Sequence, residues 1–277
     1  MTRTLSVFQS LWAMEDLPWR SASRWSLPER VERIASAGFA GLAVDLGARE
    51  APPAAELAPL LAGLRSAVFT FITDDAALDA AVRYAEAIGA ELIVGCGQVF
   101  PGDVTTAAAL VRGWLKTAAA AGIPFQLETH RYTVTNDLGF TVALLDAVPE
   151  LTLAVDLSHY VVGNELPDGP DERVDTLIGR VLDRAGSLQG RIATRGQVQV
   201  SPSFPQHRAA ADRFRAWWAA AMRTYPGDDL VFCCELGTVP YAITGADGAQ
   251  ISDRWADALL LKSWAEELFH ATERRHS

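Results

Sequence analysis

Three acidic residues each stand at the end of a short apolar run. Glu128 ends the run FQLE, Asp156 ends LTLAVD, and Glu235 ends LVFCCE. Runs of this kind are typical of buried parallel strands, whose carboxyl ends meet at one rim of a sheet or barrel. Three carboxylates at one rim would supply the oxygen ligands that a divalent metal ion prefers. For any one of them alone, the alternative is a cap on the helix that follows.

The period of two along a strand predicts which side chains share a face. Glu128 shares its side with Gln126, and Glu235 shares its side with Cys233 and Val231. We therefore expect both glutamates on the inner side of a barrel, at the tips of their strands. An unpaired charge costs free energy there, and a bound metal ion or substrate would lower that cost.

Two histidines follow these carboxylates closely. His159 comes three residues after Asp156, on the turn after its strand, where it could orient a substrate hydroxyl or transfer a proton. His130 shares its side with Glu128 and is expected to face the same cavity. The alternatives are a structural hydrogen bond for His159 and an anchoring role in the loop for His130.

An arginine and two aromatic residues complete the candidates for substrate binding. Arg195 ends a predicted seventh strand, and its guanidinium could hold a phosphate, carboxylate or enediolate oxygen, or pair with a barrel carboxylate. Trp12 follows the first strand and Tyr241 follows the last. Both are expected to wall a pocket, with ordinary burial as the alternative.

Alternating strands and helices would position these residues. Strands are expected to start near residues 5, 41, 67, 91, 124, 151, 191 and 230, and helices over 104–121, 138–147, 172–185, 209–223 and 253–271. An earlier helix begins at Ser26, because Ser26 and Glu29 form a capping box, Pro28 suits the first turn and Gly38 suits the end. Eight alternations without a Gly-x-Gly-x-x-Gly fingerprint favour an α/β fold, a closed (β/α)8 TIM barrel, over an open sheet.

Composition restricts the class of protein further. The chain has 277 residues, a hydrophobic fraction of 49%, a net charge of −10 and three cysteines. The length suits one barrel domain over residues 1–277, and the acidic balance argues against a nucleic-acid partner. Three cysteines make no disulfide framework, and we find no secretory leader and no apolar run of about 20 residues. These observations predict a cytoplasmic protein without a membrane span.

Four segments resemble a known family. They are Ile34–Gly41, Leu127–Arg131, Val155–His159 and Glu235–Gly237. Through them, and over nearly the whole chain, the sequence resembles the xylose isomerase-like TIM barrels, which include sugar-phosphate isomerases/epimerases, ketose 3-epimerases, hydroxypyruvate isomerase and inosose dehydratase. The resemblance implies a metal-dependent isomerase, epimerase or related lyase or dehydratase acting on a small polyhydroxylated carbonyl compound. It also implies a homodimer, by analogy alone.

The resemblance assigns roles to several residues. Glu128, Asp156 and Glu235 would hold a divalent ion of manganese, magnesium, cobalt or zinc, together with a histidine on strand seven. Glu128 and Glu235 would also remove and return the substrate proton beside a polarised carbonyl. His159 and Arg195 would fix substrate oxygens.

One position departs from the family pattern. The strand-seven histidine normally stands two residues before the arginine, where this chain has Ala193. Loss of this ligand predicts weak ion binding or none, unless His207 or a water takes its place. The alternative function is therefore a metal-free descendant that binds a ligand or catalyses chemistry without a metal.

Overall fold

The computed structural model describes residues 3–274, so both ends of the expected domain 1–277 lie outside the described residues. Eight strands form a closed parallel barrel, in which each strand pairs with the next along the chain and the last pairs with the first. The strands are β1 (Thr4–Ser10), β2 (Gly41–Asp45), β3 (Arg65–Ile72), β4 (Leu92–Gly97), β5 (Phe125–Glu128), β6 (Leu153–Val155), β7 (Ala185–Gly190) and β8 (Asp229–Cys234). The predicted (β/α)8 barrel is confirmed.

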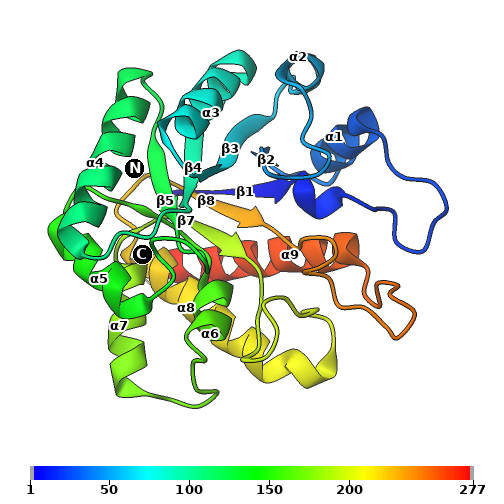
Figure 1. The fold of residues 1–277 in the computed structure, drawn as a ribbon. Helices are drawn as coiled ribbons and strands as arrows, with labels where there is room; N and C mark the ends of the chain where they lie inside the picture. The colour runs from blue at the N-terminus through cyan, green and yellow to red at the C-terminus, as the bar shows by residue number, and fades with distance from the viewer. Residues whose placement is uncertain (1–2, 275–277) are drawn as a thin grey trace.

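Helices cover the outside of the barrel (Figure 1). They are α1 (Leu27–Ser36), α2 (Ala54–Leu57), α3 (Asp75–Ile88), α4 (Val104–Ala120), α5 (Leu138–Ala147), α6 (Leu157–Gly163), α7 (Glu172–Leu182), α8 (Arg208–Thr224) and α9 (Arg254–Glu273), with 3-10 turns η1 (Trp12–Met14), η2 (Ala58–Leu60) and η3 (Pro205–His207). Among the described residues, none of these helices is both long enough and apolar enough to cross a membrane.

Local sequence signals set the ends of α1. Glu29 accepts hydrogen bonds from the backbone N–H and the hydroxyl of Ser26, at 2.7 and 2.8 Å, as the capping box predicted. Gly38 follows the helix with a φ of 71°, a conformation that a glycine adopts without the steric cost of a Cβ. The first helix therefore starts and stops where the sequence predicted.

Two apolar layers hold the barrel together. The larger layer lies between strands and helices and includes Leu127 of β5 and Phe232 of β8. A smaller cluster fills the inside of the barrel and includes Phe8, Ala154 and Cys233. The strand parity expected for β5 and β8 is therefore confirmed, and the next inward position at the end of each strand is available for polar side chains.

The seventh strand lies six residues earlier than the sequence suggested. It runs over Ala185–Gly190, whereas we expected it to begin at Arg191. Helix α7 correspondingly ends at Leu182, not at residue 185. Two glycines explain the choice, because a Cβ at Gly186 would lie 2.5 Å from the side chain of Gln126, and one at Gly190 would lie 2.6 Å from the ring of Phe232. At these two positions the strand passes too close to its neighbours for a larger residue.

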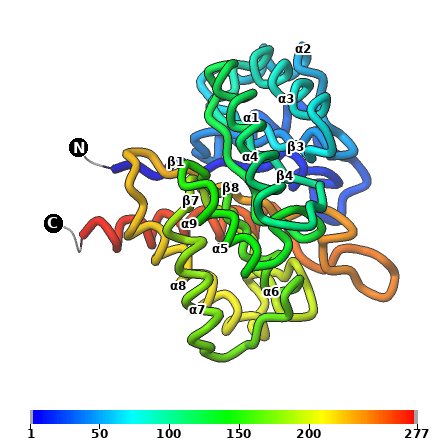
Figure 2. The backbone as a smooth tube through the Cα atoms, turned by 60° about the vertical axis from the view of Figure 1, so that its left-hand side comes forward, coloured from blue at the N-terminus to red at the C-terminus, as the bar shows by residue number. Residues whose placement is uncertain are grey.

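The strands all point toward the end of the barrel that carries the longest loops. In Figure 1 the arrows of β1, β7 and β8 point the same way, and the loops that follow them extend beyond the arrowheads. Strand β1 begins and α9 ends on the opposite side of the molecule (Figure 2), where Arg3 and Glu273 form an ion pair. The carboxyl end of the barrel is therefore where a site built from loops and strand tips would form.

Candidate active site

A cavity of about 230 Å³ lies at the carboxyl ends of the strands. Five of the residues that line it were singled out from the sequence: Trp12, Glu128, His130, Glu235 and Tyr241. The side chains of Asp45, Phe71, Cys96 and Arg191 also line the cavity, and none of these four was predicted to take part.

The three predicted carboxylates converge. Glu128, Asp156 and Glu235 each place one oxygen within 4.8 Å of the others, and their exposed fractions are 2%, 0% and 6%. The alternative of a helix cap also holds for Asp156, because its Oδ1 accepts a hydrogen bond of 2.8 Å from the N–H of Ser158 at the start of α6. One residue thus fixes the helix and belongs to the cluster.

Arg191 lies among these carboxylates. It follows β7 and is 1% exposed. Its Nε and Nη2 both donate to Asp156 Oδ2, at 2.9 and 2.7 Å, and its Nη2 lies 3.3 Å from Glu235 Oε2. Its Nη1 has no hydrogen-bond partner within the described part of the chain. The sequence-based prediction missed this residue because it placed Arg191 at the start of a strand instead of at the tip of one.

Burial and neighbouring charges set the protonation of this cluster. Burial would lower the pKa of Arg191, but Asp156 and Glu235 raise it, so the guanidinium stays charged. Burial raises the pKa of Glu128 to about 8, opposed by a hydrogen bond from the Cys96 thiol at 2.8 Å to Glu128 Oε2. Burial also raises the pKa of Glu235 well above its usual range, opposed by Arg191. Glu128 and Glu235 are therefore weaker acids than ordinary carboxyl groups.

The two predicted histidines lie against each other. The rings of His130 and His159 are 3.8 Å apart between centroids. His130 Nδ1 contacts the carbonyl oxygen of Arg131 at 2.5 Å, so Nδ1 carries the proton and Nε2 is a free acceptor. Burial lowers the pKa of His130 to about 4 and that of His159 well below its usual range. Both rings are neutral near pH 7, and neither ring nitrogen of His159 has a hydrogen-bond partner among the described residues.

Trp12 and Tyr241 form an aromatic wall over Arg191. Their rings meet edge to face at 5.1 Å, and the guanidinium carbon of Arg191 lies 5.7 Å from the Trp12 centroid and 5.0 Å from the Tyr241 centroid. Gly237 permits this arrangement, because a Cβ there would lie 1.9 Å from the Trp12 ring. Both aromatic residues line the cavity, and their role in binding a substrate stays a prediction.

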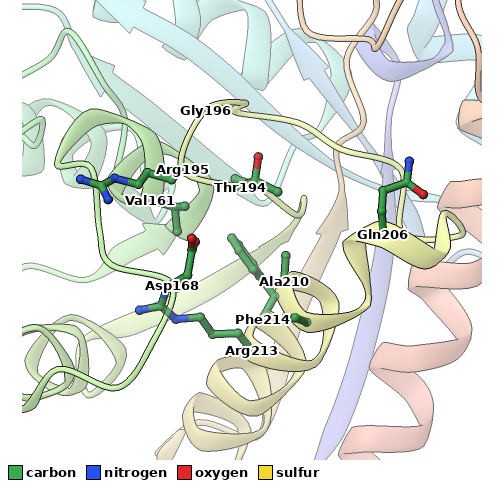
Figure 3. A pocket seen from close by; sticks show the side chains of 11 residues that line it. Val161, Asp168, Thr194, Arg195, Gly196, Gln206, Ala210, Arg213 and Phe214 are labelled. Atoms are coloured by element: carbon green, nitrogen blue, oxygen red, sulfur yellow. The ribbon is translucent and has the colours of Figure 1, made fainter.

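The structure does not bring Arg195 to this cavity. Because β7 ends at Gly190, Arg195 lies in the following loop, its side chain is 54% exposed, and it pairs with Glu165 at 3.3 Å. It lines a separate cavity of about 450 Å³ beside α8 (Figure 3), together with Asp168 and Arg213. Ala193 lines that second cavity too. The placement of Arg195 on strand seven was therefore wrong, and Ala193 is not at the inner strand tip where we looked for a histidine.

Two groups of side chains could be considered for a metal ion: Glu128, Asp156 and Glu235, and Glu128, His130 and His159. The carboxylate group does not fit a divalent cation while Arg191 is present. Both oxygens of Asp156 are engaged, Oδ1 by Ser158 and Oδ2 by Arg191. Like unit charges about 4 Å apart repel by roughly 4 kcal/mol at an effective dielectric constant of 20, and a doubly charged ion doubles this.

The histidine group meets the same opposition. Imidazoles and a carboxylate are ligand types that zinc accepts. The charges of Arg191 and Arg131, however, act on His159 strongly enough to lower its pKa further, after burial and His130, and they would repel a metal ion in the same way. His207 belongs to neither group, and its Nδ1 contacts the carbonyl oxygen of Ser201 at 2.9 Å.

Comparisons with known proteins identify the fold of this chain. No family model matches the chain, and no curated protein matches its sequence. Solved structures do match: a D-allulose 3-epimerase from Methylomonas sp. in complex with D-allulose has a TM-score of 0.59 at 18% identity, and the match covers 98% of each chain. A xylose isomerase-like TIM barrel protein from Mycobacterium smegmatis in complex with magnesium has a TM-score of 0.60 at 17% identity, again with 98% of each chain covered.

A third match is a sugar phosphate isomerase/epimerase from Parabacteroides distasonis, with a TM-score of 0.58 at 14% identity and coverage of 98% of this chain and 96% of the other. Together these matches confirm that the chain has the fold of the xylose isomerase-like TIM barrels. At such identities they establish a shared fold, and the chemistry has to be argued from the side chains.

Proposed function

We propose that the protein is an enzyme of the isomerase or epimerase type, or a related lyase, that moves a proton on a carbon beside a carbonyl group of a small polyhydroxylated compound. The observation that carries this proposal is the position of Glu128. Its carboxylate is buried, faces the cavity and forms no ion pair with Arg191 within 4.0 Å in the described structure. The sugar-binding and sugar-converting proteins that share the fold support the substrate class.

The charge arrangement assigns different tasks to the carboxylates. Arg191 neutralises Asp156 through two hydrogen bonds, so Asp156 is a poor proton acceptor. Among the described residues, the Glu128 carboxyl group receives only the weak thiol hydrogen bond of Cys96. A carboxylate with a raised pKa is a stronger base than an ordinary one, which suits removal of a carbon-bound proton. Glu128 is therefore the proton acceptor in the proposed reaction, in its ionised form, which becomes the main form above a pH of about 8.

The reaction conserves atoms and charge in two steps. Glu128 takes a proton from the carbon beside the carbonyl, and the electron pair of that C–H bond moves into a new C=C bond while the carbonyl oxygen becomes an enediolate oxygen. Glu235, in its protonated form, then returns a proton to the same carbon, and the carbonyl group is restored. When the proton goes instead to the neighbouring carbon, the hydroxyl proton of the first carbon moves to the former carbonyl oxygen, and the carbonyl group forms at the first carbon. One oxygen of each glutamate lies within 4.8 Å of the other, so a single substrate carbon can come within reach of both.

Neutral polar groups around the cavity suit a substrate with several hydroxyls. His130 lines the cavity, and its free Nε2 can accept a hydrogen bond from a hydroxyl group without adding charge. The pKa of Tyr241 is raised, by burial first, so its hydroxyl keeps its proton and can donate it in a hydrogen bond. The aromatic wall excludes water from one side of the cavity.

Solvent exchange tests the proposal and does not require the product to be identified. The purified protein is incubated in D2O with a panel of ketoses, aldoses and inososes, and loss of substrate C–H signals is followed by NMR. We expect exchange with at least one compound, and a loss of about 10²-fold or more in Glu128→Gln. Arg195→Ala is the matched control, since Arg195 lies outside the cavity, and should keep the activity. Absence of exchange and of any product across the panel would refute the proposal.

A further inference from the structure

The charge of Arg191 lies where the carboxylates of the barrel converge. Its backbone is adjacent to that of Glu235, because the N–H of Glu235 donates to the carbonyl oxygen of Gly190 at 3.2 Å. The inward parity of β7 then continues through Gln189 to Arg191, level with Glu235 on β8. A guanidinium at this level, 2.7 Å from Asp156 and 3.3 Å from Glu235, supplies positive charge to both carboxylates.

One nitrogen of this guanidinium makes no hydrogen bond to the described residues. Nη2 and Nε are used on Asp156, whereas the buried Nη1 has no hydrogen-bond partner among the residues described. A buried donor without a partner is costly and is rarely retained without a purpose. Arg191 also lines the cavity and lies under the rings of Trp12 and Tyr241. Nη1 is therefore available to a ligand in the cavity.

We propose that Arg191 replaces the divalent metal ion that the fold family would suggest, and that its Nη1 donates to the carbonyl oxygen of the substrate. This inference rests on the proposed function and deepens it, because it makes the proton transfer independent of a metal. As Glu128 removes the proton, negative charge develops on the substrate oxygen, and the fixed guanidinium stabilises it. Arginine keeps its charge at all accessible pH values, so no further group has to be recruited.

The surroundings support this role. Asp156 fixes the guanidinium through two hydrogen bonds, and the aromatic rings of Trp12 and Tyr241 cover it, so little reorganisation is needed when charge develops.

Metal analysis of the wild-type protein is the first test. The protein is incubated separately with Mn²⁺, Mg²⁺, Co²⁺ and Zn²⁺ and passed through a desalting column. Its metal content is then measured by inductively coupled plasma mass spectrometry. We expect no ion at one per chain and no shift of the melting temperature with any of the four ions. An ion retained at one per chain, on either group of ligands, would overturn the inference whether or not a substrate has been found.

Substitution of Arg191 is the second test. Arg191→His removes the guanidinium and adds an imidazole to three carboxylates, a ligand set that suits a divalent ion. We expect Mn²⁺ or Zn²⁺ to raise the melting temperature of this variant and not that of the wild type. Arg195→His, which changes an exposed arginine outside the cavity, is the matched control and should gain no such response. A wild-type protein that responds to the ions as strongly as Arg191→His would contradict the inference.

Catalysis provides the third test once an exchanging substrate is known. Wild-type exchange should continue unchanged in EDTA, and Arg191→Lys, which keeps a charge but loses the donor fork, should lose about 10²-fold or more in rate. Loss of wild-type activity in EDTA, restored by one of the ions, would refute the role of Arg191. The two proposals can fail independently. The ion-binding measurements test the role of Arg191 without a substrate, whereas the exchange measurements test the proposed function.

Discussion

Removal of the buried arginine should strongly destabilise the fold. With Nη2 2.7 Å from Asp156 Oδ2, the centres of charge lie about 4 Å apart, and at an effective dielectric constant of 20 they attract by about 4 kcal/mol. Breaking a buried pair by removing one partner typically costs about 3–5 kcal/mol. We expect Arg191→Met to lose this amount of unfolding free energy, which lowers the melting temperature by about 6–20 °C at roughly 2–4 °C per kcal/mol.

A double-mutant cycle separates the ion pair from the packing of the side chain. Asp156→Asn keeps an oxygen that can accept from the N–H of Ser158, so the start of α6 is preserved. The double variant, Arg191→Met with Asp156→Asn, keeps neither charge of the pair. Its loss of unfolding free energy should therefore be about 2 kcal/mol smaller than the sum of the losses of the two single variants. Urea unfolding followed by the fluorescence of the eight tryptophans measures all four proteins.

The exposed pair of Arg195 and Glu165 is the matched control. Its atoms approach to 3.3 Å, but the side chains are 54% and 76% exposed, so the same cycle should give a coupling below about 1 kcal/mol. If the substitutions at Arg191 and Asp156 add to within about 0.5 kcal/mol, the two residues are independent and the charge argument for this site is wrong.

Three further outcomes follow from the same structure. Gly237→Ala should raise KM about tenfold or more, because a Cβ there would lie 1.9 Å from the Trp12 ring, whereas Gly169→Ala, with no atom within 4 Å of its Cβ, should leave KM unchanged. Burial raises the pKa of Asp45 from 3.8 to about 6, so the folded protein holds this proton more tightly than the unfolded chain does and loses stability as pH rises from about 4 to about 6. Asp45→Asn should therefore gain up to about 3 kcal/mol over the wild type between pH 4 and pH 7 in urea unfolding, and a difference independent of pH would contradict this. Burial also raises the pKa of each of the three cysteines, so none should react with a thiol reagent until urea unfolds the protein, and rapid reaction in the folded state would refute their assigned burial.

The sequence was sufficient for the barrel and for the acidic cluster because both depend on strong local patterns. Apolar runs that end in Glu128, Asp156 and Glu235 specify strand position and parity together, and these two quantities place a side chain at an inner strand tip. The cap of α1 was equally clear, since its hydrogen bonds link residues only three positions apart. Where the pattern is local, the structure follows it to within two residues.

Strand β7 was misplaced because its sequence is shaped by contacts with distant residues. Leu188 is its one large apolar side chain, and its glycines are required by Gln126 and Phe232, which are remote in the sequence. The run after it, from Ile192 to Val200, is richer in β-branched residues and was more strand-like by composition. Close approach between neighbouring strands has no signature in a single sequence, so the shift of six residues could not be found.

The misplaced strand also led to Ala193 being taken as the position of the missing histidine. An argument from charge balance would have pointed to Arg191 instead. Three carboxylates at buried strand tips require a positive charge nearby, whether from a metal ion or from a side chain. When the expected histidine ligand is missing, an arginine close to the same strand becomes the natural second source of that charge. Arg191 is the residue of the predicted seventh strand that the structure places among the acids. The buried arginine at this level of the barrel thus supports the proposal that a fixed guanidinium supplies the positive charge for which a histidine-bound metal ion was expected.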